Sequence, residues 1–104
     1  MKLPSGYLNY LKNGGETEFE ADFEFGGYMA LEPLERIEEY NKEIEIEEYA
    51  PGYIAFGSDG GGEAFVFDDA GIIYLMPLIG MAPDEAIKVV DSWSEYEKMK
   101  LKTT

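Results

Sequence analysis

The most regular pattern of hydrophobic and polar positions in the chain runs through "TEFEADFEF", residues 17–25. Apolar and acidic residues alternate there, as in a strand that buries one face. The buried face is predicted to hold Phe19, Ala21, Phe23 and Phe25, and the solvent face Glu18, Glu20, Asp22 and Glu24. A Gly-Gly pair at residues 26–27 then predicts a turn into a partner strand at residues 28–31.

Two segments in the first half of the chain have helical spacing, with apolar residues three or four positions apart. The first covers residues 4–12, has an apolar face of Tyr7, Tyr10 and Leu11, and ends at an Asn-Gly-Gly stop. The second covers residues 32–42, with a predicted buried stripe of Leu34, Ile37 and Tyr40 and an acidic exposed face. The next ten residues, 43–52, fit neither period well, and an irregular connector is expected there.

The glycine-rich stretch "GSDGGG", residues 57–62, lies between two short aromatic and β-branched runs at 53–56 and 64–67. Such an arrangement predicts a β-hairpin, because glycine accepts positive φ without steric cost. The spacing G-x-x-x-x-G resembles a phosphate-binding loop, but Glu63 and Ala64 stand where that loop needs Lys and then Ser or Thr. The loop is therefore predicted to turn the chain, and contact with a partner is the alternative.

The C-terminal third predicts one more strand and one more helix. A turn at residues 68–71 leads into "IIYLMP", residues 72–77, which is apolar enough for a central strand. One helical turn is expected within residues 80–90. A last helix begins near Ser92, which fits a capping box with Glu95, and its Trp93 and Tyr96 can dock on the sheet.

Composition excludes most classes of enzyme. The chain has no cysteine and no histidine, so thiol and imidazole nucleophiles, their zinc sites and disulfides are ruled out. A carboxylate-based hydrolase needs two acids that converge in one pocket, and among 22 acidic residues a close pair carries no information. We expect a single, non-catalytic domain over residues 1–104, with no cofactor and no metal.

Charge is the strongest compositional feature. The formal net charge is −14, and residues 16–48 hold 13 acidic residues against Arg36 and Lys42. This segment would repel nucleic acid and attract a basic protein surface, although the same acids could simply keep an aromatic-rich domain soluble. No apolar run is long enough for a membrane span, and the start has no signal-peptide core, so a cytoplasmic location is predicted.

Three stretches, in order, resemble one known family. They are "LPSGYLNYLKNGG" (3–15), "YAPGYIAFGSDGGGEAFVFD" (49–68) and "LIGMAPDEAIKVVDSWSEY" (78–96). Together they are similar to the Smi/Knr type of the SUKH superfamily, named partly for a yeast cell-wall synthesis regulator, over residues 3–97. The resemblance implies an α+β domain with a mainly antiparallel sheet, on which N-terminal, middle and C-terminal helices pack.

The resemblance also implies a function. Bacterial members mostly act as immunity proteins, each of which binds and neutralises a toxin, and many of those toxins are nucleases. The expected partner is a cognate toxin with a basic surface, and neither a nucleic acid nor a membrane. A regulatory or scaffold adaptor that binds a cellular protein is the alternative, and the presence of an adjacent toxin gene would separate the two.

Eight residues are candidates for the partner surface. The acidic segment supplies Glu38, Glu39, Glu47 and Glu48, the Pro-Gly turn is flanked by Tyr49 and Tyr53, and the glycine loop offers Asp59 and Glu63. Aromatic anchors are expected because a few buried aromatic side chains commonly dominate binding energy. The alternatives are core packing for the two tyrosines, and turn formation and solvation for the two acids of the loop.

Overall fold

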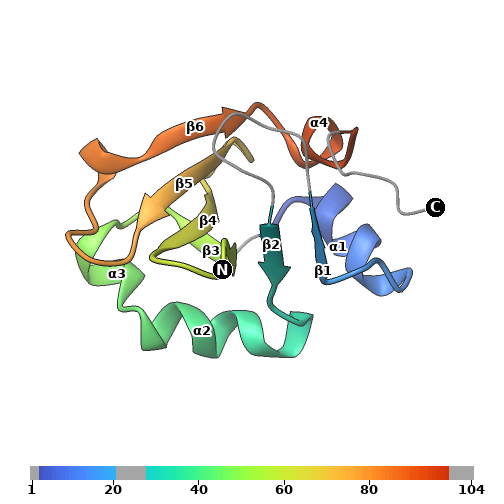
Figure 1. Cartoon of the computed structure of the whole chain (residues 1–104), viewed down its shortest axis with the longest axis horizontal. Coiled ribbons are helices and arrows are strands. Elements are labelled where there is room, and N and C mark those ends of the chain that lie inside the picture. The colour runs from blue at the N-terminus through green and yellow to red at the C-terminus, as the bar shows by residue number, and fades with distance from the viewer. Residues whose placement is uncertain (1–2, 21–27, 99–104) are drawn as a thin grey trace.

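Six antiparallel strands form one sheet in the computed structural model, which describes residues 3–20 and 28–98 (Figure 1). The spatial order is β1-β2-β3-β4-β5-β6, so every strand pairs with its neighbour in sequence. The strands are β1 (Glu18–Glu20), β2 (Tyr28–Leu31), β3 (Ile54–Ser58), β4 (Glu63–Phe67), β5 (Ile73–Pro77) and β6 (Ile87–Val90). The expected α+β class with an antiparallel sheet is thus confirmed.

Helices cover both faces of this sheet. They are α1 (Ser5–Lys12), α2 (Ile37–Glu43), α3 (Ile46–Tyr49) and α4 (Trp93–Lys98), with 3₁₀ turns η1 (Leu34–Arg36) and η2 (Pro83–Glu85). In Figure 1, α1 and α4 lie together at one end of the molecule, while α2 runs below β3 and leads to α3 at the other end. None of the helices in the described ranges is long and apolar enough to cross a membrane.

The two faces of the sheet bury side chains of different size, because successive strand residues point to opposite faces. One face is aromatic: Phe56, Phe65 and Phe67 pack there with Tyr7 of α1 and with Trp93 and Tyr96 of α4. The other face is built from smaller residues: Ala55, Ala64, Val66 and Met76 pack there with Ile46 and Ala50. The aromatic face buries more apolar area and supplies the main core. We call the cluster on this second face, which has the smaller side chains, the thin core.

Several predicted elements are confirmed. The first helix forms with Tyr7 fully buried, and the glycine loop closes the hairpin of β3 and β4. The last helix begins as expected, and the backbone N–H of Glu95 donates to Ser92 Oγ at 3.2 Å. Phe19 is buried between exposed Glu18 and Glu20 on β1, which pairs with β2. The rest of that predicted strand, residues 21–25, lies outside the described residues.

Three predictions need correction. Leu34 is exposed rather than part of a buried stripe, since the chain ahead of α2 winds as a 3₁₀ turn, which changes the angular position of Leu34 relative to Ile37. Residues 43–52 are not wholly irregular, because α3 forms there and buries Ile46. Residues 80–90 contain the expected helical turn, η2, but they also contain the edge strand β6. Exposed and partly buried residues do not alternate along β6, so the sequence has no strand pattern there.

Candidate functional site

A groove of about 640 Å³ lies between helices α2 and α3 and the beginning of strand β3, and we call it the α2–α3 groove. Its lining residues are Glu38, Asn41, Lys42, Ile46, Glu47, Gly52, Tyr53, Ile54, Asp68 and Asp69. They come from α2, α3, the turn before β3, the first residue of β3 and the turn between β4 and β5. Four acidic residues and one lysine give this lining a formal charge of −3.

Asn41 fixes the position of α2 against the sheet. Its side-chain amide donates to the carbonyl oxygens of Ile37, at 2.7 Å, and Ala55, at 2.8 Å, and its Oδ1 accepts the N–H of Ala55 at 2.7 Å. Asn41 is buried, so these bonds satisfy polar groups that water cannot reach. Helix α2, which forms one wall of the groove, is therefore fixed to strand β3.

A left-handed residue joins the two helices that form this wall. Glu45 has φ 55° and ψ 40°, a conformation that costs an L-residue with a Cβ about 1–2 kcal/mol. The reversal ends α2 and starts α3, so that Ile46 enters the thin core while Glu47 stays exposed beside it. The strain is offset by the burial of Ile46.

The carboxylates of the groove differ in how they are paired. Asp68 is held in its turn, because its Oδ1 accepts the N–H groups of Ala70 and Ile72 and its Oδ2 accepts the hydroxyl of Tyr74 at 3.0 Å. Burial, and then this bond to Asp68, raises the pKa of Tyr74. By contrast, Glu38 has only an exposed ion pair with Lys42, at 3.5 Å.

Two further carboxylates of the groove are available to a partner. Within the described residues, the side chains of Glu47 and Asp69 make no hydrogen bond or ion pair, and both residues are exposed. Nearby, Tyr53 is half-buried and packs edge-on against Tyr74, with ring centroids 5.6 Å apart. The groove thus combines two unpaired carboxylates with the partly buried aromatic ring of Tyr53.

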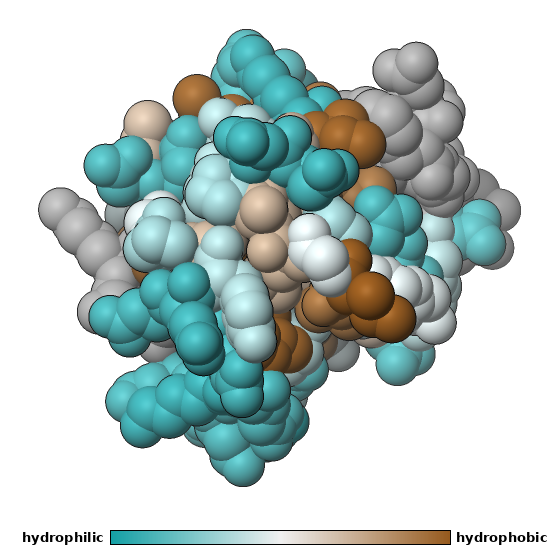
Figure 2. All heavy atoms as spheres, turned by 90° about the vertical axis from the view of Figure 1, so that its left-hand side faces the viewer, coloured by the Kyte–Doolittle hydropathy of each residue, from teal (hydrophilic) through white to brown (hydrophobic). Residues whose placement is uncertain are grey.

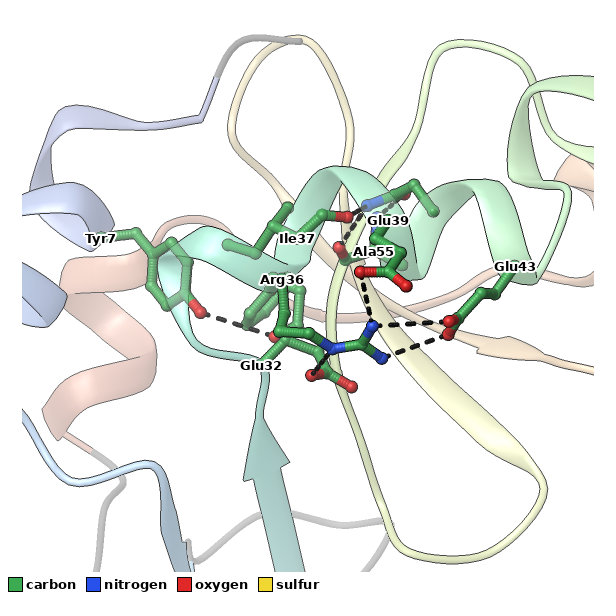
Figure 3. Close-up of polar contacts among 9 residues, drawn as sticks. Tyr7, Glu32, Arg36, Ile37, Glu39, Glu43 and Ala55 are labelled. Atoms are coloured by element: carbon green, nitrogen blue, oxygen red, sulfur yellow. Dashed lines mark hydrogen bonds and ion pairs between the residues drawn. The ribbon is translucent and has the colours of Figure 1, made fainter.

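Another side of α2 carries acids that share a single cation. Arg36 forms ion pairs with Glu32 at 3.9 Å, Glu39 at 2.9 Å and Glu43 at 3.2 Å (Figure 3). The hydrogen bonds to Glu43 and Glu39 raise the pKa of the Arg36 guanidinium, which is charged at any physiological pH. We call Arg36 and its three carboxylates the Arg36 cluster. In this cluster three carboxylates share one guanidinium, whereas Glu47 and Asp69 of the groove have no cation paired with them.

The structure brings three of the eight predicted residues together in the groove, namely Glu38, Glu47 and Tyr53. Glu39 belongs to the Arg36 cluster instead. Glu48 and Tyr49 are exposed on α3 but do not line the groove, and Tyr49 keeps 49% of its surface accessible. The charged positions of the middle segment therefore fall on more than one surface.

The two predicted residues of the glycine loop lie on the hairpin. Oδ1 of Asp59 accepts the N–H of Gly61 at 2.8 Å and that of Glu63 at 3.3 Å. This is the turn chemistry that the sequence left as an alternative, because an Asp side chain often bonds to the backbone two residues ahead. Glu63 opens β4 opposite Pro77 and is half-buried. Neither lines the α2–α3 groove.

Sequence reasoning missed several residues of this region. Asn41 gave a usable signal, since it stands four positions after Ile37 on the apolar face, where a polar residue implies a buried hydrogen bond. Asp68 and Asp69 were recognised only as turn residues. Ile79 was not singled out, although it is 92% exposed beside Leu78, which packs against the thin core.

The end of the molecule at which α3 lies is mostly hydrophilic, with separate hydrophobic spots (Figure 2). An interface on this end would be polar with a few apolar anchors, as is usual for a protein–protein contact that is not obligate. In the ranges that the structure covers, no group of three or more acidic residues is arranged to hold a metal ion.

A known protein family matches most of the chain. The model of the SMI1 / KNR4 family (SUKH-1) matches residues 1–98. No curated protein matches the chain.

Proposed function

Because the chain belongs to the SMI1 / KNR4 family (SUKH-1), we propose that it is an immunity protein that neutralises a cognate bacterial toxin by binding it. Membership in this family generally implies interaction with a protein partner, in immunity or regulation, and not catalysis. The proposed role places the protein in the cytoplasm, where a delivered toxin would act.

The observation that carries the proposal is the unpaired negative charge around α2 and α3. Glu47 and Asp69 have no cationic partner among the described residues, and the lining of the groove is negative overall. Such a surface attracts a basic protein and accelerates the encounter. A nuclease is the toxin class that fits best, because it needs a basic surface for phosphates.

Coexpression in bacteria tests the proposal. A toxin gene found next to the gene for this chain would be expressed from an inducible promoter, with and without the chain, and growth and copurification would be measured. Protection together with a stable complex supports an immunity role. No protection, together with a stable complex with an endogenous housekeeping protein, would replace it with the adaptor function.

A further inference from the structure

We infer that the α2–α3 groove is the docking site for a short basic segment of the partner protein. An apolar side chain of that segment would lie against Tyr53 and Ile54, and its Arg or Lys side chains would pair with Glu47 and Asp69. The inference rests on the proposed function, since it assumes a protein partner, and it names the site and the chemistry of the segment that enters it.

The shape of the groove limits what can enter. Its volume of about 640 Å³ lies within the usual range of about 300–1,000 Å³ for sites that enclose a small ligand. Such a volume accommodates a few side chains of an extended segment and not a folded domain. Apolar surface from Ile46, Tyr53 and Ile54 can cover an aliphatic side chain, as the anchor of a binding segment requires.

The negative charge of the groove determines the sign of the charge that its occupant must carry. Asp68 is committed to its turn, so its carboxylate contributes a fixed negative potential, whereas the carboxylates of Glu47 and Asp69 have open hydrogen-bonding capacity. A guanidinium or ammonium group is attracted by all of them. A phosphate or an acidic peptide is repelled.

Lys42 partly occupies the place of such a cation. Its side chain is 77% exposed, that of its partner Glu38 is 74% exposed, and the pair is separated by 3.5 Å. Exposed pairs of this kind are weak, so an incoming cation can compete for Glu38. The Arg36 cluster offers no comparable opening, because Arg36 already contacts three carboxylates there.

Binding of a defined peptide tests the inference. The probe is acetyl-Arg-Leu-Arg-amide, titrated at low ionic strength into the ¹⁵N-labelled full chain and followed by amide chemical shifts. Saturable shifts are expected at Glu47, Gly52, Tyr53 and Asp69. Acetyl-Gln-Leu-Gln-amide should give none of them, and acetyl-Arg-Gly-Arg-amide should bind more weakly because it lacks the apolar anchor.

Charge variants identify the groove as the site. Glu47→Gln with Asp69→Asn should weaken binding about 3- to 10-fold, as expected when two exposed ion pairs are lost. Glu18→Gln with Glu20→Gln on β1 changes the net charge equally and should leave the affinity within about 2-fold. Lys42→Gln should tighten binding, because it frees Glu38. Equal weakening by both double variants, or shifts spread over all acidic surfaces, would overturn the inference.

The same variants in the coexpression assay separate this inference from the proposed function. If the chain protects cells and the Glu47→Gln, Asp69→Asn variant protects equally well, the groove is not the docking site and the immunity role stands. If the chain protects against no toxin, the immunity role fails, while the peptide titration still reports on the groove.

Discussion

Asn41 of α2 and Ala55 of β3 are joined by two hydrogen bonds, of 2.7 and 2.8 Å, between the side-chain amide and both backbone polar groups. The side chain acts here as a short substitute for a neighbouring strand. Strand β2 pairs with β3 only at Gly57 and Ser58, so Ala55 has no partner from β2. One side chain thereby completes the sheet and anchors the wall of the groove.

Replacing Asn41 should therefore destabilise the protein. Asn41→Ala leaves the N–H and C=O of Ala55 buried without these partners, which should lower the free energy of unfolding by about 2–4 kcal/mol. Urea denaturation measures the change. Asn9→Ala, on the exposed side of α1, is the control and should shift stability by no more than about 0.5 kcal/mol. Equal stability of the two variants would mean that water replaces the amide.

The glycines of the hairpin should differ sharply in their tolerance of alanine. A Cβ on Gly57 would lie 2.7 Å from the carbonyl oxygen of Ala30, and a backbone atom of the neighbouring strand cannot easily move. Gly57→Ala should cost about 1–3 kcal/mol of stability. Gly62→Ala should be tolerated, since nothing lies within 4 Å of its Cβ and its φ is not positive. Thermal melting of both variants checks the contrast, and similar melting would contradict the close approach of β2 to β3.

At position 45, where the backbone is left-handed, glycine should give a more stable protein than alanine. Glu45→Gly removes the Cβ that makes φ 55° unfavourable, although glycine also loses more entropy on folding. The expected net gain over Glu45→Ala, which keeps a Cβ, is about 0.5–1 kcal/mol. Urea denaturation of the two variants gives this difference directly. A glycine variant less stable than the alanine variant would show that the corner between α2 and α3 is not strained.

Two buried tyrosines should make the fold sensitive to alkali. Burial raises the pKa of Tyr7 and of Tyr96 well above the ordinary tyrosine value. A raised pKa in the folded state means that the protonated form is the stable one, so stability is complete below about pH 10 and falls as the pH rises further. The fall should approach about 1.4 kcal/mol per pH unit for each of the two groups.

Substitution by phenylalanine tests the origin of this alkaline loss. Tyr7→Phe and Tyr96→Phe should each flatten the decrease of unfolding free energy between pH 10 and higher pH, because the titrating hydroxyl is removed. Tyr28→Phe, which removes an exposed hydroxyl, is the matched control. An unchanged slope in both buried variants would assign the alkaline loss to other groups.

Salt and charge reversal should alter association with the cognate toxin. Reversing Glu38, Glu39, Glu47 and Glu48 to Lys should slow association several-fold without unfolding the domain, because all four are exposed. Raising the salt concentration should also slow it, since exposed charges are screened beyond about 8 Å at physiological ionic strength. Stopped-flow kinetics at two salt concentrations measures both effects. A rate indifferent to salt and to charge reversal would mean that these acids serve solubility alone.

The sequence alone determined the local elements whose pattern is complete within a few residues. Glycines flanked by aromatic and β-branched runs were enough to predict the hairpin of β3 and β4, and the spacing of Tyr7 and Leu11 predicted α1. The absence of cysteine and histidine excluded whole classes of chemistry, and three motifs in order indicated the family. These features depend on backbone propensity and residue type, which act locally.

Tertiary structure decided which of the acidic residues lie together on one surface. Glu39 pairs locally with Arg36, three positions before it, whereas the turn at Glu45 places Glu47 at the edge of the groove. Asp69 reaches the same groove from a turn more than twenty residues away. Which carboxylates share a surface depends on distances between segments remote in the chain, and those distances are set only when α2 and α3 pack on the sheet.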